Sequence, residues 1–161
     1  MHPTVRRVLI CGLSIAATGC TWAKNAAHAV TPRADPPENV RWNGVLYAAT
    51  DTMGDTASMA YGTAWLAPAP GNLILTRVMV VRARPGARYQ WQVHLGNCWR
   101  DRGEFGAGNT YPTIAADSTG TATGEATLPL GFPNSGSYFV RVYAIDSGPP
   151  DRLCGSLIKP F

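Results

Sequence analysis

The chain has 161 residues, which is enough for one domain with a hydrophobic core and too short for two domains of ordinary size. Charged residues make up only 15%, and the 17 glycines and 13 prolines suit short strands joined by turns. The formal net charge of +4 falls to about +2 without the two arginines of the N-terminal segment, and the remaining arginines are scattered, so no nucleic-acid partner is expected.

The N-terminal segment has the pattern of an export signal. A basic stretch precedes an apolar run of about a dozen residues, which is too short to span a membrane. The small residues that follow, AATGC, end at Cys20 and resemble the processing box of bacterial lipoproteins, in which this cysteine is acylated. The sequence therefore predicts a lipoprotein-type signal peptide over 1–19 and lipidation of Cys20. The alternative is cleavage at AHA, residues 27–29.

Residues 20–40 are rich in alanine, proline and charge and show no hydrophobic alternation, which predicts a tether. An acylated Cys20 would hold the domain over 41–161 at a membrane surface as an anchor, without a span. We therefore expect an exported protein of the periplasm or outer surface. Its expected partners are the membrane, through the lipid, and an unidentified envelope protein or ligand.

From residue 41 onward, strand-like runs alternate with turn-forming residues. Between the runs at 87–94 and 110–117 lies a polar, glycine-rich stretch, 96–109, which reads as a long loop. The runs at 110–117 and 121–130 read as a hairpin-like pair joined by the turn DSTG. Eight or so strands and no helix predict an all-β antiparallel sandwich or barrel. The other expected strands cover residues 41–49, 59–67, 72–83, 136–146 and 152–158.

Two of these runs alternate clearly between apolar and polar residues, as a strand with one buried face does. The inward set is expected to form the core, and it comprises Tyr89, Trp91, Val93, Tyr138, Val140 and Val142. The outward set comprises Arg88, Gln90, Gln92, His94, Phe139, Arg141 and Tyr143.

Four cysteines are present, of which Cys11 lies in the apolar leader and Cys20 is the predicted lipid site. The remaining two, Cys98 and Cys154, most often pair in an exported chain, and closing this loop would stabilise the fold by about 4 kcal/mol. A metal site built on two cysteines and a histidine is the alternative, but no CxxC spacing supports it. Trp99 either covers the disulfide or presents an exposed aromatic ring.

Several motifs together resemble the Cu/Zn superoxide dismutases and their bacterial relatives. WQVHLGNC, residues 91–98, is similar to the copper-binding strand and the loop cysteine of that family, and LCGSLI, residues 153–158, is similar to the C-terminal motif that carries the second cysteine. AADSTGTATGEATL and GSYFVRVYA also resemble family segments. The resemblance covers residues from about 57 to 158. It implies a Greek-key β-sandwich in which a Cys98–Cys154 disulfide ties the long loop to the last strand.

The metal ligands of that family are mostly missing. Its copper is held by four histidines, one of which bridges to zinc, and its zinc needs two further histidines and an aspartate. Beyond the leader and tether this chain has one histidine, His94. Gln92 and Tyr143 stand at two copper-histidine positions, and a neutral amide is a poor ligand for Cu(II). The resemblance thus implies the scaffold without the dismutase chemistry.

We therefore expect a non-catalytic binding or structural module of the cell envelope, with no cofactor. The alternatives are an atypical Cu/Zn superoxide dismutase and a protein that binds copper weakly without turnover. In the second case His94 would be the metal ligand, completed by Gln92, Tyr143, Asp101 or Glu104. The simpler interpretation of His94 is an outward strand residue that hydrogen-bonds to loop groups.

Overall fold

The computed structural model of the chain describes residues 34–48, 60–146 and 152–160. The predicted signal peptide, Cys20, the tether up to residue 33 and the polar turn expected at 50–58 lie outside these ranges. The compact unit Asp35–Phe161 contains every described strand. The hydrophobic core formed by the described residues lies within this unit, which is therefore expected to fold by itself.

The described part of the chain is mostly antiparallel β-sheet, which confirms the predicted β-rich class. None of its helices is long and apolar enough to cross a membrane. Strands and 3-10 helices follow in the order η1 (Glu38–Val40), β1 (Trp42–Ala48), β2 (Tyr61–Ala69), β3 (Leu73–Val81), β4 (Arg88–Asn97), β5 (Arg100–Glu104), η3 (Gly108–Thr110), β6 (Ile114–Ala115), β7 (Ala122–Leu128), β8 (Tyr138–Ala144) and β9 (Arg152–Leu157).

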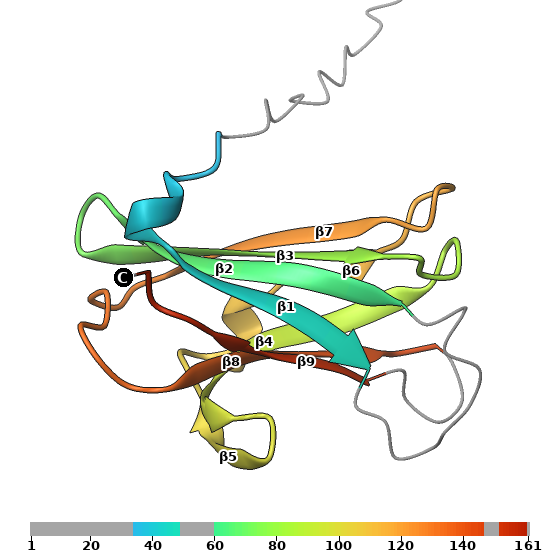
Figure 1. The fold of residues 1–161 in the computed structure, drawn as a ribbon. Helices are drawn as coiled ribbons and strands as arrows, with labels where there is room; N and C mark the ends of the chain where they lie inside the picture. The colour runs from blue at the N-terminus through green and yellow to red at the C-terminus, as the bar shows by residue number, and fades with distance from the viewer. Residues whose placement is uncertain (1–33, 49–59, 147–151, 161) are drawn as a thin grey trace, which may run out of the picture. The chain divides into compact units, whose positions relative to one another are not determined.

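The strands form one curled sheet that folds into two layers (Figure 1). Its order is β5-β4-β8-β9-β1-β2-β3-β7, and β6 pairs with β4. The curl occurs at β1, which pairs with β2 through residues 42–46 and with β9 through Tyr47 and Ala48. Strands β1, β2, β3 and β7 thus make one layer, and β4, β8 and β9 make the other.

The core lies between the two layers, where the alternation of the sequence places apolar side chains. Trp91 and Val93 of β4 are fully buried there, as predicted, and so are Val140 and Val142 of β8. Removing these side chains from water is the main favourable term in folding. The largest fully buried side chains are Trp91, Tyr89, Phe139, Leu46, Leu66, Ile74, Leu128, Leu153, Val78, Val80, Val93 and Val140.

The segment 96–109 was expected to be a long loop, and this expectation is wrong. The chain turns tightly at Cys98 and Trp99 and returns as β5, antiparallel to β4. The side-chain oxygen Oδ1 of Asn97 accepts hydrogen bonds from the backbone N–H groups of Trp99 (3.0 Å) and Arg100 (2.9 Å), which fixes the turn. The result is a hairpin that projects from one layer.

The expected hairpin-like pairing of residues 110–117 with 121–130 is also wrong, although the turn between them is present. The backbone N–H of Gly120 donates to the Asp117 carbonyl (3.1 Å), and Asp117 Oδ1 accepts from the N–H of Thr119 (2.8 Å). Beyond the turn the chain changes layers, so β6 pairs with β4 while β7 pairs with β3. Each strand pairs with the layer that buries its apolar face, and the turn alone does not select the partner.

The last residues of the predicted tether contact the sheet. Asp35 forms ion pairs with Arg77 of β3 and with Arg41, and Glu38 of η1 also pairs with Arg41. A short ordered segment therefore precedes β1 within the compact unit that begins at Asp35.

Candidate functional site

A disulfide joins the β4–β5 hairpin to β9, which belongs to the same layer. Cys98, in the turn, is bonded to Cys154 of β9, with Cα atoms 5.9 Å apart, and this confirms the predicted pairing. Gly96 makes the close approach of the two hairpin strands possible, because its φ is +102° and a Cβ atom there would lie 2.1 Å from the Arg100 carbonyl oxygen. The disulfide at Cys98 and the close contact of Gly96 with Arg100 thus fix the position of the hairpin.

His94 lies under this hairpin, on the outer face of β4. The sequence predicts an outward side chain, and the direction is right, but the residue is only 5% exposed because β5 folds over it. Its Nδ1–H group donates to Asp101 Oδ1 of β5 at 3.1 Å, and its ring stacks on Phe139 of β8 with centroids 5.1 Å apart. Phe139, also predicted to point outward, is fully buried for the same reason.

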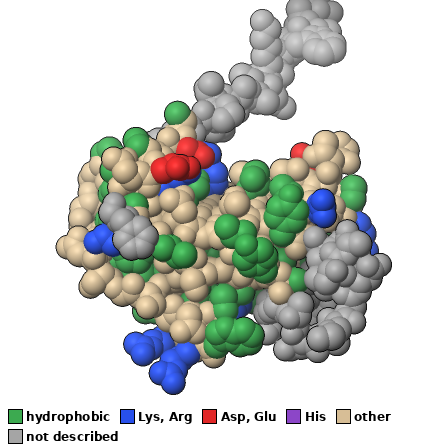
Figure 2. Space-filling model, in the orientation of Figure 1, with side chains coloured by type: hydrophobic (Ala, Val, Ile, Leu, Met, Phe, Trp, Pro, Cys, Tyr) green, Lys and Arg blue, Asp and Glu red, His purple; other side chains and the backbone are tan. Residues whose placement is uncertain are grey.

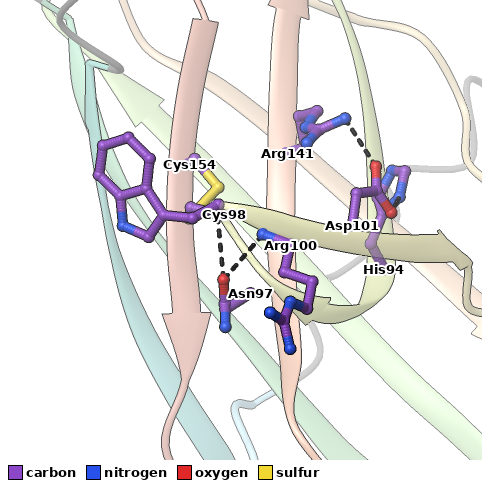
Figure 3. The surroundings of a disulfide bond; sticks show 8 residues. His94, Asn97, Cys98, Arg100, Asp101, Arg141 and Cys154 are labelled. Carbon is purple, nitrogen blue, oxygen red and sulfur yellow. Dashed lines mark hydrogen bonds and ion pairs between the residues drawn. A yellow bond between two sulfur atoms is a disulfide. The ribbon is translucent and has the colours of Figure 1, made fainter.

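Asp101 joins His94 to Arg141 in one network (Figure 3). Arg141 Nη1 donates to Asp101 Oδ2 at 2.8 Å, and the backbone N–H of Gly103 donates to Oδ1 at 2.9 Å. Burial raises the pKa of Asp101, but the hydrogen bonds from Gly103 and His94 and the attraction of His94 and Arg141 outweigh it, so the pKa lies below its ordinary value of 3.8. Asp101 is therefore a carboxylate at neutral pH.

Ionised Asp101 should make the stability of the domain depend on acid pH. A depressed pKa in the folded state stabilises the fold above the ordinary value and loses this contribution as the pH falls through the lowered pKa. We expect Asp101→Asn to flatten the fall in unfolding free energy below about pH 4, measured by urea denaturation at successive pH values. If the unfolding free energy falls as steeply with acid pH in the variant as in the parent protein, Asp101 does not have the stabilising contacts described here.

The geometry leaves His94 one atom with which to bind a metal. Donation from Nδ1 to a carboxylate is the arrangement in which a histidine binds a metal through Nε2. That Nε2 atom is buried without a hydrogen-bond partner in the described structure. The other ligands of a copper site are not assembled around it, because the described residues contain no group of three His, Cys, Asp or Glu side chains that could hold a metal. The described residues around His94 therefore do not fit a copper site of the dismutase type.

Among the proposed co-ligands, Glu104 is opposite His94 in the β4–β5 ladder, and Gln92 lies two residues before His94 on β4. Gln92 is opposite Arg141 in the β4–β8 ladder, and Tyr143 is opposite Gln90. Tyr143 follows the partner of His94 by four residues, which is about 13 Å along a strand. Of the four proposed co-ligands, Asp101 is hydrogen-bonded to His94, and its carboxylate is already paired with Arg141.

Arg141 is the member of the network that sequence reasoning missed. It stands at an outward position of β8, where a charged side chain in water is the ordinary expectation. Its guanidinium Cζ lies 5.3 Å from the centroid of the Phe139 ring, so it also covers that ring. The available signal was that His94 and Arg141 both occupy outward positions of predicted strands.

Trp99 does not cover the disulfide, because it is 93% exposed at the tip of the hairpin. Its neighbours Arg100 and Arg102 line a cleft between the hairpin and Ser137, which precedes β8. The exposed tip of the hairpin is a second candidate site, and its residues differ from those of the network around buried His94.

No known protein family and no curated protein matches this chain.

Proposed function

We propose that the chain is an exported, lipid-anchored, superoxide dismutase-like β-sandwich that has lost most of the metal ligands and serves as a non-catalytic binding or structural module of the cell envelope. The proposal rests mainly on the contacts of His94, which occupy its side chain in holding the fold together. Its ring is stacked on Phe139 and bonded to Asp101, which is in turn paired with Arg141, so the histidine holds the hairpin on the sheet.

The order of the strands supports a Greek-key topology for this sandwich. Strands β1, β2 and β3 are consecutive antiparallel neighbours, and β9 returns from the end of the chain to lie beside β1. In a Greek key the strand after three consecutive strands returns to lie beside the first; here β9, the last strand of the chain, takes that place. The disulfide between Cys98 and Cys154 is also the one that the resemblance implies. Both features favour a scaffold of the dismutase type.

A weak copper-binding protein is the second candidate, because the Nδ1 of His94 is bonded to a carboxylate and its Nε2 has no partner in the described structure. One imidazole without further assembled ligands would bind copper weakly. This candidate and the first differ in a measurable way, since only the second makes copper binding depend on His94.

Copper titration tests the proposal. We expect the oxidised chain from residue 21 onward, dialysed against a chelator, to retain no stoichiometric copper, and His94→Ala to give the same calorimetric isotherm as the parent protein. His28→Ala, in the predicted tether, is the matched control for a histidine outside the domain. One copper ion per chain that is retained in the His28→Ala variant and lost in His94→Ala would overturn the proposal.

A further inference from the structure

The outer surface around the disulfide carries two exposed aromatic side chains and two arginines. Tyr47 of β1 is the ladder partner of Cys154, and Cys154 is bonded to Cys98, which precedes Trp99. The exposed fractions are 64% for Tyr47 and 93% for Trp99. Together with Arg100 and Arg102 of β5 these residues are called the aromatic–arginine surface. It is held in place by the disulfide and by the Asn97 hydrogen bonds to the turn.

The two arginines of this surface differ from most others in the domain. Arg41, Arg77, Arg88 and Arg141 all form ion pairs with acidic side chains. Within the part of the chain that the structure describes, Arg100 and Arg102 have no acidic partner, although both line the cleft beside Ser137. Residues two apart in a strand point to the same face, so the two guanidinium groups present positive charge to one side. Guanidinium groups bind phosphate oxygens in a forked geometry.

The end of the domain that β5 forms carries positive charge. In Figure 2 the acidic side chains on the visible face gather mainly near η1, whereas basic side chains lie at the end formed by β5 and also at other places on this face. A hydrophobic cluster lies between them, over β1 and β2. Val45 and Tyr47 are exposed residues of β1 in this part of the domain. A membrane with anionic headgroups complements such a surface, because tryptophan and tyrosine favour the interface and arginine favours the phosphates.

We propose that the aromatic–arginine surface docks the domain onto anionic phospholipid headgroups, with Trp99 inserted at the interface and Arg100 and Arg102 on the phosphates. A small soluble anion would account for the arginines only, because Trp99 does not line the cleft. The inference rests on the proposed function, since it names what the non-catalytic module binds. The 14 residues between Cys20 and Asp35 extend to about 50 Å at most, so an anchor at Cys20 allows this face to reach the bilayer.

Vesicle sedimentation tests the docking. The chain from residue 21 onward lacks the lipid, and it should bind phosphatidylcholine vesicles that contain phosphatidylglycerol better than vesicles of phosphatidylcholine alone. Each arginine near an anionic membrane contributes about fivefold to the partition coefficient, so Arg100→Gln with Arg102→Gln should lower it about 30-fold. The matched control is Arg82→Gln with Arg84→Gln in the β3–β4 connection, which has the same spacing and charge change and should bind nearly as the parent protein does.

The tryptophan gives a second readout. Trp42, Trp65 and Trp91 are buried, so in a Trp22→Phe background the emission that shifts to the blue on binding should come from Trp99 and disappear in Trp99→Phe. Equal binding to neutral and anionic vesicles, or unchanged binding by the Arg100/Arg102 variant, would overturn the proposal in favour of a protein partner. Complete competition by soluble glycerol phosphate would overturn it in favour of a free-phosphate site. Copper-dependent turnover with intact vesicle binding would instead reject the proposed function and leave the docking in place.

Discussion

Replacing both Cys98 and Cys154 with serine should lower the unfolding free energy by about 4 kcal/mol. The disulfide joins residues 56 apart in sequence, and closing a loop of this size removes about that much conformational free energy from the unfolded chain. Small domains are stable by only about 5–15 kcal/mol, so this is a large part of the total. The variant should therefore unfold at a much lower urea concentration than the oxidised parent protein.

Reduction of the parent protein provides the control, because it breaks the same bond without a substitution and should shift the urea midpoint to a similar value. Alkylation under denaturing, non-reducing conditions should find neither Cys98 nor Cys154 free. If the oxidised protein and the double variant unfold at the same urea concentration, the disulfide does not constrain the unfolded state in the way that the structure implies.

Trp91→Ala should cost about 3–5 kcal/mol and leave the domain only marginally folded. The side chain of Trp91 is fully buried, and its Nε1–H donates to the Pro112 carbonyl at 2.9 Å. It packs edge-on against Tyr111, with ring centroids 5.1 Å apart, and reaches β7 of the other layer, where a Cβ on Gly124 would lie 2.7 Å from Nε1. Its removal would leave a cavity between the layers and an unpaired carbonyl.

Trp99→Ala is the matched control, since it makes the same substitution at a side chain that is 93% exposed. It should change the unfolding free energy by no more than about 0.5 kcal/mol. Guanidinium denaturation followed by circular dichroism measures both variants. Similar losses for the two substitutions would contradict the placement of Trp91 between the layers. Trp91→Phe, which keeps a ring but loses the hydrogen bond, should be destabilised less than Trp91→Ala.

The strands of the core could be predicted because their sequences alternate. Tyr89, Trp91 and Val93 identify the inner face of β4 without any knowledge of its partners, and the glycine and proline residues between runs mark the turns. The β-rich class and the disulfide follow from local pattern and cysteine count. The pairing of β6 with β4 and of β7 with β3 does not, because it depends on which layer buries each strand.

The candidate sites depend on β5, which has no hydrophobic signal. All five of its residues are exposed, so the segment Arg100–Glu104 reads as a loop, and its conformation comes from the turn at Asn97 and the disulfide. Once β5 folds back, it buries His94 and Phe139 and brings Asp101 to Arg141. His94 and Phe139 thus became buried at outward positions through a tertiary contact that the periodicity of β4 and β8 does not contain.

The central claim, a dismutase-like scaffold without dismutase chemistry, is tested most directly by an assay of superoxide dismutation on the oxidised chain from residue 21 onward after loading with copper and zinc and removal of unbound metal. The account predicts no turnover above that of the same sample after heat denaturation, and no difference between the parent protein and His94→Ala. Chelator-resistant turnover that His94→Ala abolishes would contradict it, because a single buried imidazole would then be part of a working copper site.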